Sequence, residues 1–371
     1  MTAHSCVSRL AIDRAVAALR AGTPVVIASG ADDQVVADVV IAAAHATPQW
    51  TAWLVRFTSG LICAAMPARR ADELDLPAMP HDDDSDVAAP AFAVAVDAAS
   101  GIGTGISATD RARTARVLAS DSSRPSDLVR PGHVLPVKVA CCGVLKRPGS
   151  AEATVDLCEI AGLPPVGLTA ALLGEDGELL QEPAVSAFAR HHRLPMMHID
   201  TVVHHRLFHG DGRRKRVVLV QNRLDQLGGR PLRAVDFEDQ LTGARHTVFV
   251  GAAVPDIDPP VYVLKECVHG DPLLASGCEC RVDFQRCHDR IAEHGGILVY
   301  LRPPITSAPR FSAPQTELLA GSVTAMLIEL GYTAVTLADR GQHAYLTSRC
   351  DLVVSGPPAA SPSCRLSAAA H

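Results

Sequence analysis

The first half of the chain alternates between stretches with helical spacing of apolar residues and short apolar runs, and this alternation limits the fold more than any other feature. Ile12, Val16 and Leu19 lie on one helical face, and Gly22 ends that helix before the strand-like segment PVVIA. Further strands are predicted at 60–66 and 92–96, and further helices at 106–120 and 151–162. Helices and strands interleaved in this order predict an α/β layer architecture.

The second half has a different order of elements. A polar, glycine-containing stretch at 204–216 gives way abruptly to VVLVQ, which indicates a domain boundary. Short strands are predicted at 216–221, 246–251 and 261–266, followed by helices at 282–294 and 315–330 with a strand at 296–301 between them. We therefore predict an α/β domain over 8–206, an α+β domain over 214–350 and a flexible Pro/Ser/Ala-rich tail over 351–371.

Composition excludes several classes of protein. The 371 residues are 48% hydrophobic but only 4% aromatic, which suits two folded domains with cores of Ala, Val, Leu and Ile. A formal charge of -6 gives no reason to expect nucleic-acid binding. The N-terminal segment lacks the apolar core of a signal peptide, and no apolar run is long enough to span a membrane. We expect a cytoplasmic protein whose eleven cysteines are mostly core residues or metal ligands.

The segment KECVHGDPLLASGCEC (265–280) contains a candidate metal site. Cys267, Cys278 and Cys280 could supply three thiolates and leave a fourth position for water, which is the arrangement of catalytic zinc. The alternative is three small buried residues beside a tight turn. His269 and Asp271 are then turn formers or supporting groups, or His269 is a fourth ligand that closes the site and makes it structural.

Longer motifs add a family resemblance. The cysteine segment resembles the zinc-binding segment of GTP cyclohydrolase II, and the GGILVYLR that follows fits the same family. The first half resembles 3,4-dihydroxy-2-butanone 4-phosphate synthase in the blocks GLICAAM, TGISATDR, RPGHVLPV, GVLKRPGSAEATVDL and AGLPPVGL, which occur in that order. Together the blocks extend over 8–340. The chain therefore resembles the bifunctional riboflavin-biosynthesis family that fuses the two activities.

The resemblance implies a magnesium site in the synthase half, and several of its positions differ here. The acidic metal-binding loop corresponds to SGADDQVVAD, in which Asp32, Asp33 and Asp38 are retained as candidate catalytic acids. The family's metal-binding glutamate corresponds to Gln34, its metal-binding histidine to Ser150, and a further acid to Ala171. Magnesium demands hard oxygen ligands, preferably charged ones, so these replacements put magnesium binding in question. We expect the synthase reaction to be absent.

The blocks that handle phosphate are better retained. The resemblance implies that a phosphorylated ligand, such as ribulose 5-phosphate or GTP, is contacted by Thr104, Ser107, Arg111, Arg130 and Glu152. Ser107 is alternatively a helix N-cap. His133 is a candidate catalytic residue or a structural histidine. The resemblance also implies a homodimer through the first domain, because the apolar scaffold blocks are intact.

The cyclohydrolase half differs from the family after its VYLR strand. Pro303 and Pro304 replace the start of a Gln-Glu-Gly-Arg segment that grips the nucleotide, and no Arg-Ala-Tyr segment follows. Arg302 and Arg310 are the nearest cations. We expect zinc to be kept and GTP turnover to be lost or reduced, which favours a regulatory or scaffold role. The alternatives are a residually active zinc hydrolase of the GTP cyclohydrolase II type and a repurposed zinc hydrolase acting on another ring substrate.

Overall fold

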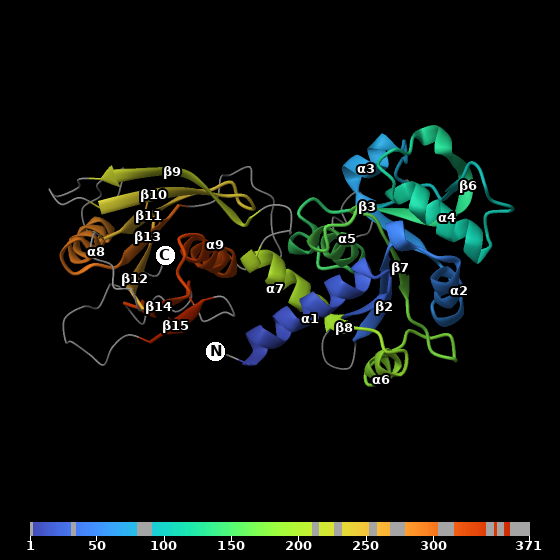
Figure 1. Cartoon of the computed structure of the whole chain (residues 1–371), viewed down its shortest axis with the longest axis horizontal. Helices are drawn as coiled ribbons and strands as arrows, with labels where there is room; N and C mark the ends of the chain where they lie inside the picture. Colours follow the sequence, from blue (N-terminus) through green and yellow to red (C-terminus); the bar gives the residue numbers. More distant parts are fainter. Residues whose placement is uncertain are drawn as a thin grey trace. The chain divides into compact units, whose positions relative to one another are not determined.

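The computed structural model describes residues 3–30, 35–79, 91–209, 215–225, 232–251, 258–267, 279–302, 315–338, 345–346 and 352–356. The chain divides into two compact units, one running from Ser8 to Arg206 and the other built mainly from Leu207 onward. We call them the N-terminal and C-terminal units, and Figure 1 shows their helices and strands. None of the described helices is long and apolar enough to cross a membrane.

The N-terminal unit contains a mixed sheet with the strand order β4-β6-β3-β7-β2-β1-β8, and β5 pairs with β6 off this path. The strands are β1 (Val25–Ser29), β2 (Val36–Ala42), β3 (Cys63–Pro67), β4 (Ala91–Phe92), β5 (Val96–Ala98), β6 (Leu128–Val139), β7 (Gly167–Ala171) and β8 (Met196–His198). Strand β2 pairs antiparallel with β7, and β3 pairs antiparallel with β7 and parallel with β6.

Helices cover both faces of this sheet. They are α1 (Ala3–Arg20), α2 (Pro48–Phe57), α3 (Ala68–Glu73), α4 (Ala108–Ala119), α5 (Ser150–Ile160), α6 (Ala184–His191) and α7 (Ile199–His209). Val25 and Ile27 of β1 pack in one core with α1, α5 and α7, whereas Val26 between them packs in another core with α2, α4 and α6. Successive strand residues therefore point to opposite apolar layers, which confirms the predicted α/β architecture.

The C-terminal unit contains a seven-stranded sheet in the order β15-β14-β12-β13-β11-β10-β9. The strands are β9 (Val217–Asp225), β10 (Leu232–Asp239), β11 (Arg245–Val250), β12 (Pro260–Lys265), β13 (Ile297–Leu301), β14 (Ala334–Leu337) and β15 (Val353–Ser355). Strands β9 to β11 pair antiparallel, whereas β12 pairs parallel with β13 and β14. Strand β9 forms the edge, and its pairing with β10 is interrupted by a register shift.

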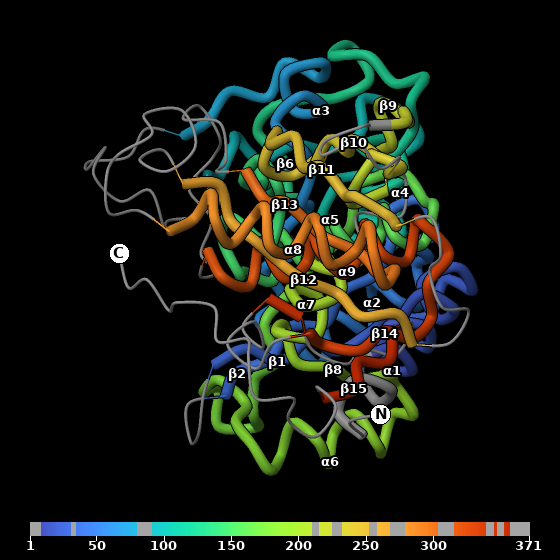
Figure 2. The backbone as a smooth tube through the Cα atoms, turned by 90° about the vertical axis from the view of Figure 1, so that its left-hand side faces the viewer, coloured from blue at the N-terminus to red at the C-terminus, as the bar shows by residue number. Residues whose placement is uncertain are grey.

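Two helices cover the faces of the C-terminal sheet. Helix α8 (Cys280–His294) packs through Cys287 and Ile291 on Phe249 and Leu298, and Figure 2 shows it lying along the sheet. Helix α9 (Gln315–Glu329) packs on the opposite face, in the core that includes Phe237. The mixture of an antiparallel and a parallel half, with one helix on each face, agrees with the predicted α+β class.

The structure contains elements that the sequence analysis did not predict, namely β2, β6, β7, β8, β10, β14, α2, α3, α6 and α7. Three strands show how prediction and structure differ. The strand predicted at 92–96 is split into β4 and β5, because Val94 donates its backbone N–H to the carbonyl of Pro77. Strand β10 was not predicted, because its sequence LRAVDFED interrupts the apolar run with charges. Val353–Ser355 were placed in the flexible tail, but they form β15 and pair with β14.

Candidate functional site

Asp38 is the centre of a small polar cluster in the N-terminal unit. It lies on β2 directly opposite Ala171 of β7. Ser150 is the first residue of α5, and its hydroxyl donates to Asp38 Oδ2 at 2.5 Å. Thr169 of β7 donates to the other carboxyl oxygen at 3.5 Å. The fold therefore brings together three of the positions that the family resemblance singled out, Asp38, Ser150 and Ala171.

Burial raises the pKa of two side chains in this cluster. Burial raises the pKa of Asp38, and the hydrogen bonds from Ser150 and Thr169 oppose that shift only in part. Cys63, which lies opposite Thr169 on β3, has its pKa raised to about 11 by burial and by the nearby charge of Asp38. The carboxyl of Asp38 therefore lies beside a thiol, two hydroxyls and a methyl group, with no second acid among these neighbours.

These described residues do not fit a magnesium site. Magnesium needs several oxygen ligands with carboxylate charge, and this cluster offers one carboxyl whose oxygens already accept hydrogen bonds from Ser150 and Thr169. The imidazole and the second acid that the resemblance implies are a hydroxyl at Ser150 and a methyl group at Ala171. Asp32, Asp33 and Gln34 lie outside the described residues.

His133 lies in β6, and Asp97 contacts both its backbone and its ring. The carboxylate of Asp97 accepts from the backbone N–H of His133 at 3.0 Å, and its second oxygen lies 2.7 Å from His133 Nδ1. Gly105 closes over this pair, because a Cβ there would lie 2.0 Å from Asp97 Oδ2. The aspartate fixes the ring, so His133 has the orientation that a catalytic histidine needs. A structural histidine could be held in the same way.

The first turn of α4 is capped by its own side chains. Ser107 Oγ accepts from the backbone N–H of Asp110 at 3.1 Å, and Asp110 Oδ2 accepts from the N–H of Gly105 at 3.1 Å. Burial alone would raise the pKa of Asp110, but hydrogen bonds from Gly103, Gly105 and Ser107 and the charge of His133 lower it overall. Ser107 therefore has the capping role in this structure, and a carboxylate occupies the end of the helix where an anion would bind.

The remaining candidate phosphate contacts lie in different surroundings. Arg111 is buried and donates from Nη1 to the carbonyl of Gly60 at 3.1 Å, while its Nε has no hydrogen-bond partner among the described residues. Burial lowers the pKa of Arg111, although the charge of Asp97 opposes this. Thr104 is exposed. Of these residues, Arg111 has the most free donor capacity.

Arg130 and Glu152 already have protein partners. Arg130 Nη2 donates to the carbonyls of Leu74 and Asp75, each at 2.8 Å. Glu152 is 1% exposed and accepts from Arg147 and from the backbone N–H of Ala140, the latter at 3.0 Å. The structure does not gather Thr104, Ser107, Arg111, Arg130 and Glu152 around one shared set of hydrogen bonds.

Two of the three predicted zinc ligands, Cys267 and Cys280, lie within the described residues. Cys267 follows β12, and Cys280 is the first residue of α8. Cys278, His269 and Asp271 lie outside the described residues. In the described ranges no group of three His, Cys, Asp or Glu side chains could hold a metal ion. The thiols of Cys267 and Cys280 have the ligand chemistry that zinc prefers.

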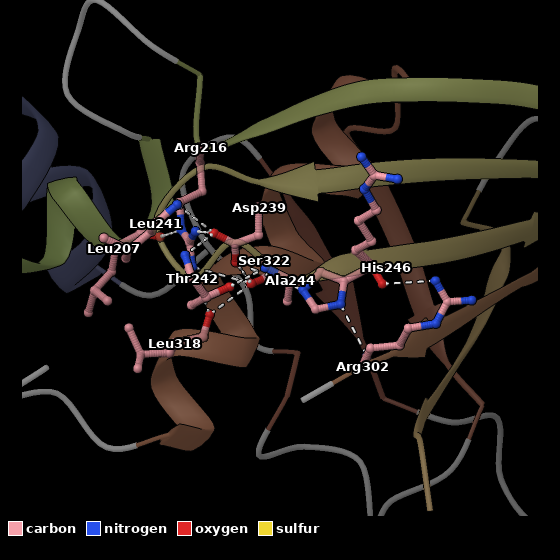
Figure 3. Close-up of polar contacts among 11 residues, drawn as sticks. Leu207, Arg216, Asp239, Leu241, Thr242, Ala244, His246, Arg302, Leu318 and Ser322 are labelled. Carbon is pink, nitrogen blue, oxygen red and sulfur yellow. Dashed lines mark hydrogen bonds and ion pairs between the residues drawn. The ribbon is translucent and has the colours of Figure 1, made fainter. Parts of the chain in front are cut away.

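A buried charge cluster in the C-terminal unit was not predicted from the sequence. Arg216 forms an ion pair with Asp239, and their side chains are 2% and 0% exposed. Asp239 also accepts from the backbone N–H groups of Leu241 and Thr242, at 2.8 and 3.0 Å, and from Ser322 at 2.6 Å. Figure 3 shows these side chains converging between β10 and α9. Asp239 therefore satisfies the charge of Arg216 and several backbone donors at once.

His246 links this cluster to the end of β13. Its Nδ1 accepts the backbone N–H of Arg302 at 3.2 Å, so the neutral ring carries its proton on Nε2, which lies 3.9 Å from Asp239 Oδ2 (Figure 3). Burial, then the charges of Arg216 and Arg302, lower the pKa of His246 to about 4. The ring is therefore neutral near pH 7 and holds the start of the segment that follows β13. The sequence signal that could have located this cluster is the polar turn from Asp239 to Thr242, which precedes His246.

Comparisons with protein families match both halves of the chain. The model of 3,4-dihydroxy-2-butanone 4-phosphate synthase matches residues 13–205, and the model of GTP cyclohydrolase II matches residues 216–312. The riboflavin biosynthesis protein RibBA of Salinispora arenicola is 38% identical over 295 residues, covering 78% of this chain and 69% of the relative. The protein of the same name from Rhodococcus jostii is 35% identical over 299 residues, covering 78% and 70%.

Solved structures show similar folds. A two-domain 3,4-dihydroxy-2-butanone 4-phosphate synthase from A. baumannii, RibBX, covers 93% of this chain and 99% of that chain, with a TM-score of 0.62 and 23% identity. A 3,4-dihydroxy-2-butanone 4-phosphate synthase in complex with two magnesium ions covers 54% of this chain and 98% of that chain, with a TM-score of 0.50 and 35% identity.

Proposed function

Because the chain belongs to the riboflavin-biosynthesis family that joins a 3,4-dihydroxy-2-butanone 4-phosphate synthase domain to a GTP cyclohydrolase II domain, we propose that it is a cytoplasmic member without the synthase reaction. Its role is then regulatory or structural, through a bound phosphorylated ligand or a protein partner. The observation that carries the proposal is the hydrogen bond of 2.5 Å from Ser150 to Asp38, opposite Ala171.

That hydrogen bond matters because of what it replaces. Synthase chemistry on a sugar phosphate needs proton transfers near a metal-held substrate, and these need carboxylates and an imidazole. At the described positions the chain offers an aspartate with a raised pKa, a hydroxyl that donates to it and a methyl group. Gln34, which lies outside the described residues, adds an amide where the family has a carboxylate.

Restoring the missing groups tests the proposal. The triple variant Gln34→Glu, Ser150→His and Ala171→Glu should gain formate release from ribulose 5-phosphate with magnesium, whereas Ser150→His alone should not. A matched control, Ser107→His on the same unit, should also remain inactive. If Ser150→His alone turned over substrate, the loss would not depend on the three positions together.

For the C-terminal unit we propose one zinc ion per chain, held by Cys267, Cys278 and Cys280. The donor chemistry of these thiols supports the proposal, because thiolates are preferred zinc ligands and binding deprotonates them. Elemental analysis should find close to one equivalent of zinc, and the variant with Cys278→Ser and Cys280→Ser should lose it. The buried residue Cys287 provides a control, because Cys287→Ser should keep the metal. Native protein without zinc would contradict this site.

Turnover of GTP should be absent or severely reduced even with zinc bound. The segment after Arg302 begins Pro303-Pro304 and supplies few groups to hold a nucleotide. The second candidate function is a residual GTP cyclohydrolase II reaction or a related zinc hydrolysis, and the complete set of three cysteines favours it. A formate-release assay with GTP on the zinc-loaded protein separates the two, because measurable zinc-dependent formate would favour the residual enzyme.

We also propose a homodimer formed through the N-terminal unit. The two apolar cores that flank its sheet are complete, and none of the replaced site positions belongs to them. Substitutions at the site therefore leave the scaffold that the family shares unchanged. Sedimentation at micromolar concentration should give the mass of a dimer, and a monomer at that concentration would contradict the proposal.

A further inference from the structure

Helices α2 and α6 of the N-terminal unit, which are labelled in Figure 1, carry aromatic and basic side chains. We call this set of side chains the aromatic–basic face. Its residues are Trp50, Trp53, Arg56, Phe57, Phe188, Arg190, His191, His192 and Arg193. Both tryptophans of a chain that is only 4% aromatic belong to it.

The rings form one continuous cluster around Trp53. Its ring centre lies 5.0 Å from Phe57, 5.7 Å from Phe188 and 5.2 Å from His192, and Trp50 lies 6.0 Å away. All five of these residues are half-buried rather than enclosed. Trp50, Trp53 and Phe188 pack on the core beneath. The rings therefore cover the core with their inner edges and present their outer edges to solvent.

The face is positively charged and lacks acids. Neither α2 nor α6 contains Asp or Glu. Arg56, Arg190 and Arg193 are exposed, and no carboxylate of the described ranges forms an ion pair with any of them. Glu182, just before α6, accepts from Ser186 instead. The positive charge of the arginines is therefore uncompensated at this surface.

The polar groups of the rings also lack partners. The indole N–H groups of Trp50 and Trp53 donate to no acceptor within the residues that the structure describes, and neither is enclosed. Arg56 lies over the ring of Phe57, with its guanidinium carbon 5.2 Å from the ring centre. Burial and the neighbouring His191 lower the pKa of His192, whereas the three arginines carry a permanent positive charge. The guanidinium and indole groups of the face are hydrogen-bond donors.

We propose that the aromatic–basic face docks an acidic segment of a partner protein, in which carboxylates are interspersed with apolar side chains. The carboxylates would accept from the guanidinium and indole donors, and the apolar side chains would pack on the outer ring edges. Tryptophan and arginine are the residues that most often dominate binding at interfaces. The inference does not depend on loss of the synthase reaction.

A second copy of the chain is the wrong occupant for this surface. If a two-fold axis passed through this patch, six arginines would share one interface to which neither α2 nor α6 contributes an acid. We therefore place the proposed homodimer interface on another face of the N-terminal unit. Nucleic acid is disfavoured by the formal charge of -6 on the whole chain.

The two tryptophans make binding directly measurable, because the intrinsic tryptophan fluorescence of the full chain arises only from this face. The probe is a twelve-residue peptide of Glu-Glu-Leu repeats, which has no tryptophan of its own. We expect a saturable change in tryptophan emission that weakens as salt is added. A Lys-Lys-Leu peptide of the same length should give no saturable change. An equal response to both peptides, or none to either, would overturn the proposal.

Charge reversal identifies the residues responsible. The variant with Arg56→Glu and Arg190→Glu should bind the acidic peptide about tenfold or more weakly, because two of the three arginines of the face become negative and repel the carboxylates of the peptide. Arg69→Glu, which reverses an arginine that is 85% exposed on α3, is the matched control and should bind like the unmodified protein. Equal weakening in both variants would assign binding to overall charge. Tighter binding of the unmodified protein to anionic vesicles or single-stranded DNA would make the partner a different class of molecule.

Discussion

The two units each contain a strand aspartate that accepts a hydrogen bond from a helix serine, and the two aspartates have opposite surroundings. Asp38 accepts from Ser150 at 2.5 Å with no cation among its partners, and its pKa is raised. Asp239 accepts from Ser322 at 2.6 Å, but it also pairs with buried Arg216 and two backbone N–H groups. A buried cation and several donors therefore surround Asp239, whereas hydroxyl donors alone contact Asp38 among the described residues.

The largest expected effect is at the buried ion pair. Asp239→Ala leaves Arg216, which is 2% exposed, without its carboxylate, and should destabilise the C-terminal unit by about 3–5 kcal/mol. All four tyrosines lie in the C-terminal unit and both tryptophans in the N-terminal unit, so denaturant unfolding can be followed in each unit separately. A loss below about 1 kcal/mol would show that the cluster does not hold the unit together.

The second prediction is that the two units respond to pH in opposite directions. Burial raises the pKa of Asp156 on α5 to about 7, although Arg206 and the Val144 N–H lower it. Its folded pKa lies above its unfolded value, so its contribution to the N-terminal unit is lost as pH rises from about 4 to 7. The folded pKa of His246, about 4, lies below its unfolded value of 6.5, so its contribution to the C-terminal unit is lost as pH falls from 6.5 to 4.

Two variants isolate these groups. Asp156→Asn should flatten the pH dependence of the N-terminal unit between pH 4 and 7, and His246→Gln should flatten that of the C-terminal unit between pH 6.5 and 4. Denaturation midpoints recorded by tryptophan and by tyrosine emission at each pH give both curves. Unchanged slopes in the variants would assign the pH dependence to other groups.

A smaller effect is expected at the hydrogen bond between Ser150 and Asp38. Ser150→Ala removes a hydroxyl donor from Asp38, and because that carboxyl has a raised pKa the loss should be about 1 kcal/mol. Tryptophan-detected unfolding of the variant measures it. A destabilisation equal to that of Asp239→Ala would mean that Asp38 is ionised and that the two clusters are equivalent.

The smallest effect is expected at an exposed pair. Lys215 lies 2.7 Å from Glu329 with 68% of its side chain exposed, so Lys215→Ala should change stability by no more than about 1 kcal/mol. This variant is the control for the buried pair. Lys215 and Arg216 both precede β9, and each donates to a residue of α9. If Lys215→Ala matched Asp239→Ala, burial would not explain the difference.

The fold class of each unit could be predicted from the sequence, although about half of the strands could not. Helical spacing at Ile12, Val16 and Leu19 and apolar strand runs give the same elements in the structure, since apolar periodicity directly reflects which face is buried. Strand β10 could not be found in this way, because its charged residues are compensated by partners distant in sequence. Asp236, for example, is bound by Arg223 and Thr247.

The sites were less predictable than the fold. The sequence identified Asp38, Ser150 and Ala171 as members of one site, but only the register of β2 with β7 shows that Asp38 and Ala171 are direct neighbours. The ion pair joins Arg216, directly before β9, to Asp239 of β10, and Arg216 also donates to Ser322 of α9. No local pattern in the sequence reveals such a pairing. The sequence is compatible with two roles for Ser107, helix capping and ligand contact. The structure shows that its hydroxyl accepts from the backbone N–H of Asp110.

The most direct test of the central claim is the synthase reaction of the unmodified protein. Purified full chain with magnesium and ribulose 5-phosphate should release no formate above a blank without protein, because the described site has one carboxyl with a raised pKa and no imidazole at position 150. An active synthase of the family, assayed in parallel, establishes the detection limit. Formate that rises with protein concentration and requires magnesium would contradict the claim that this unit has lost its chemistry.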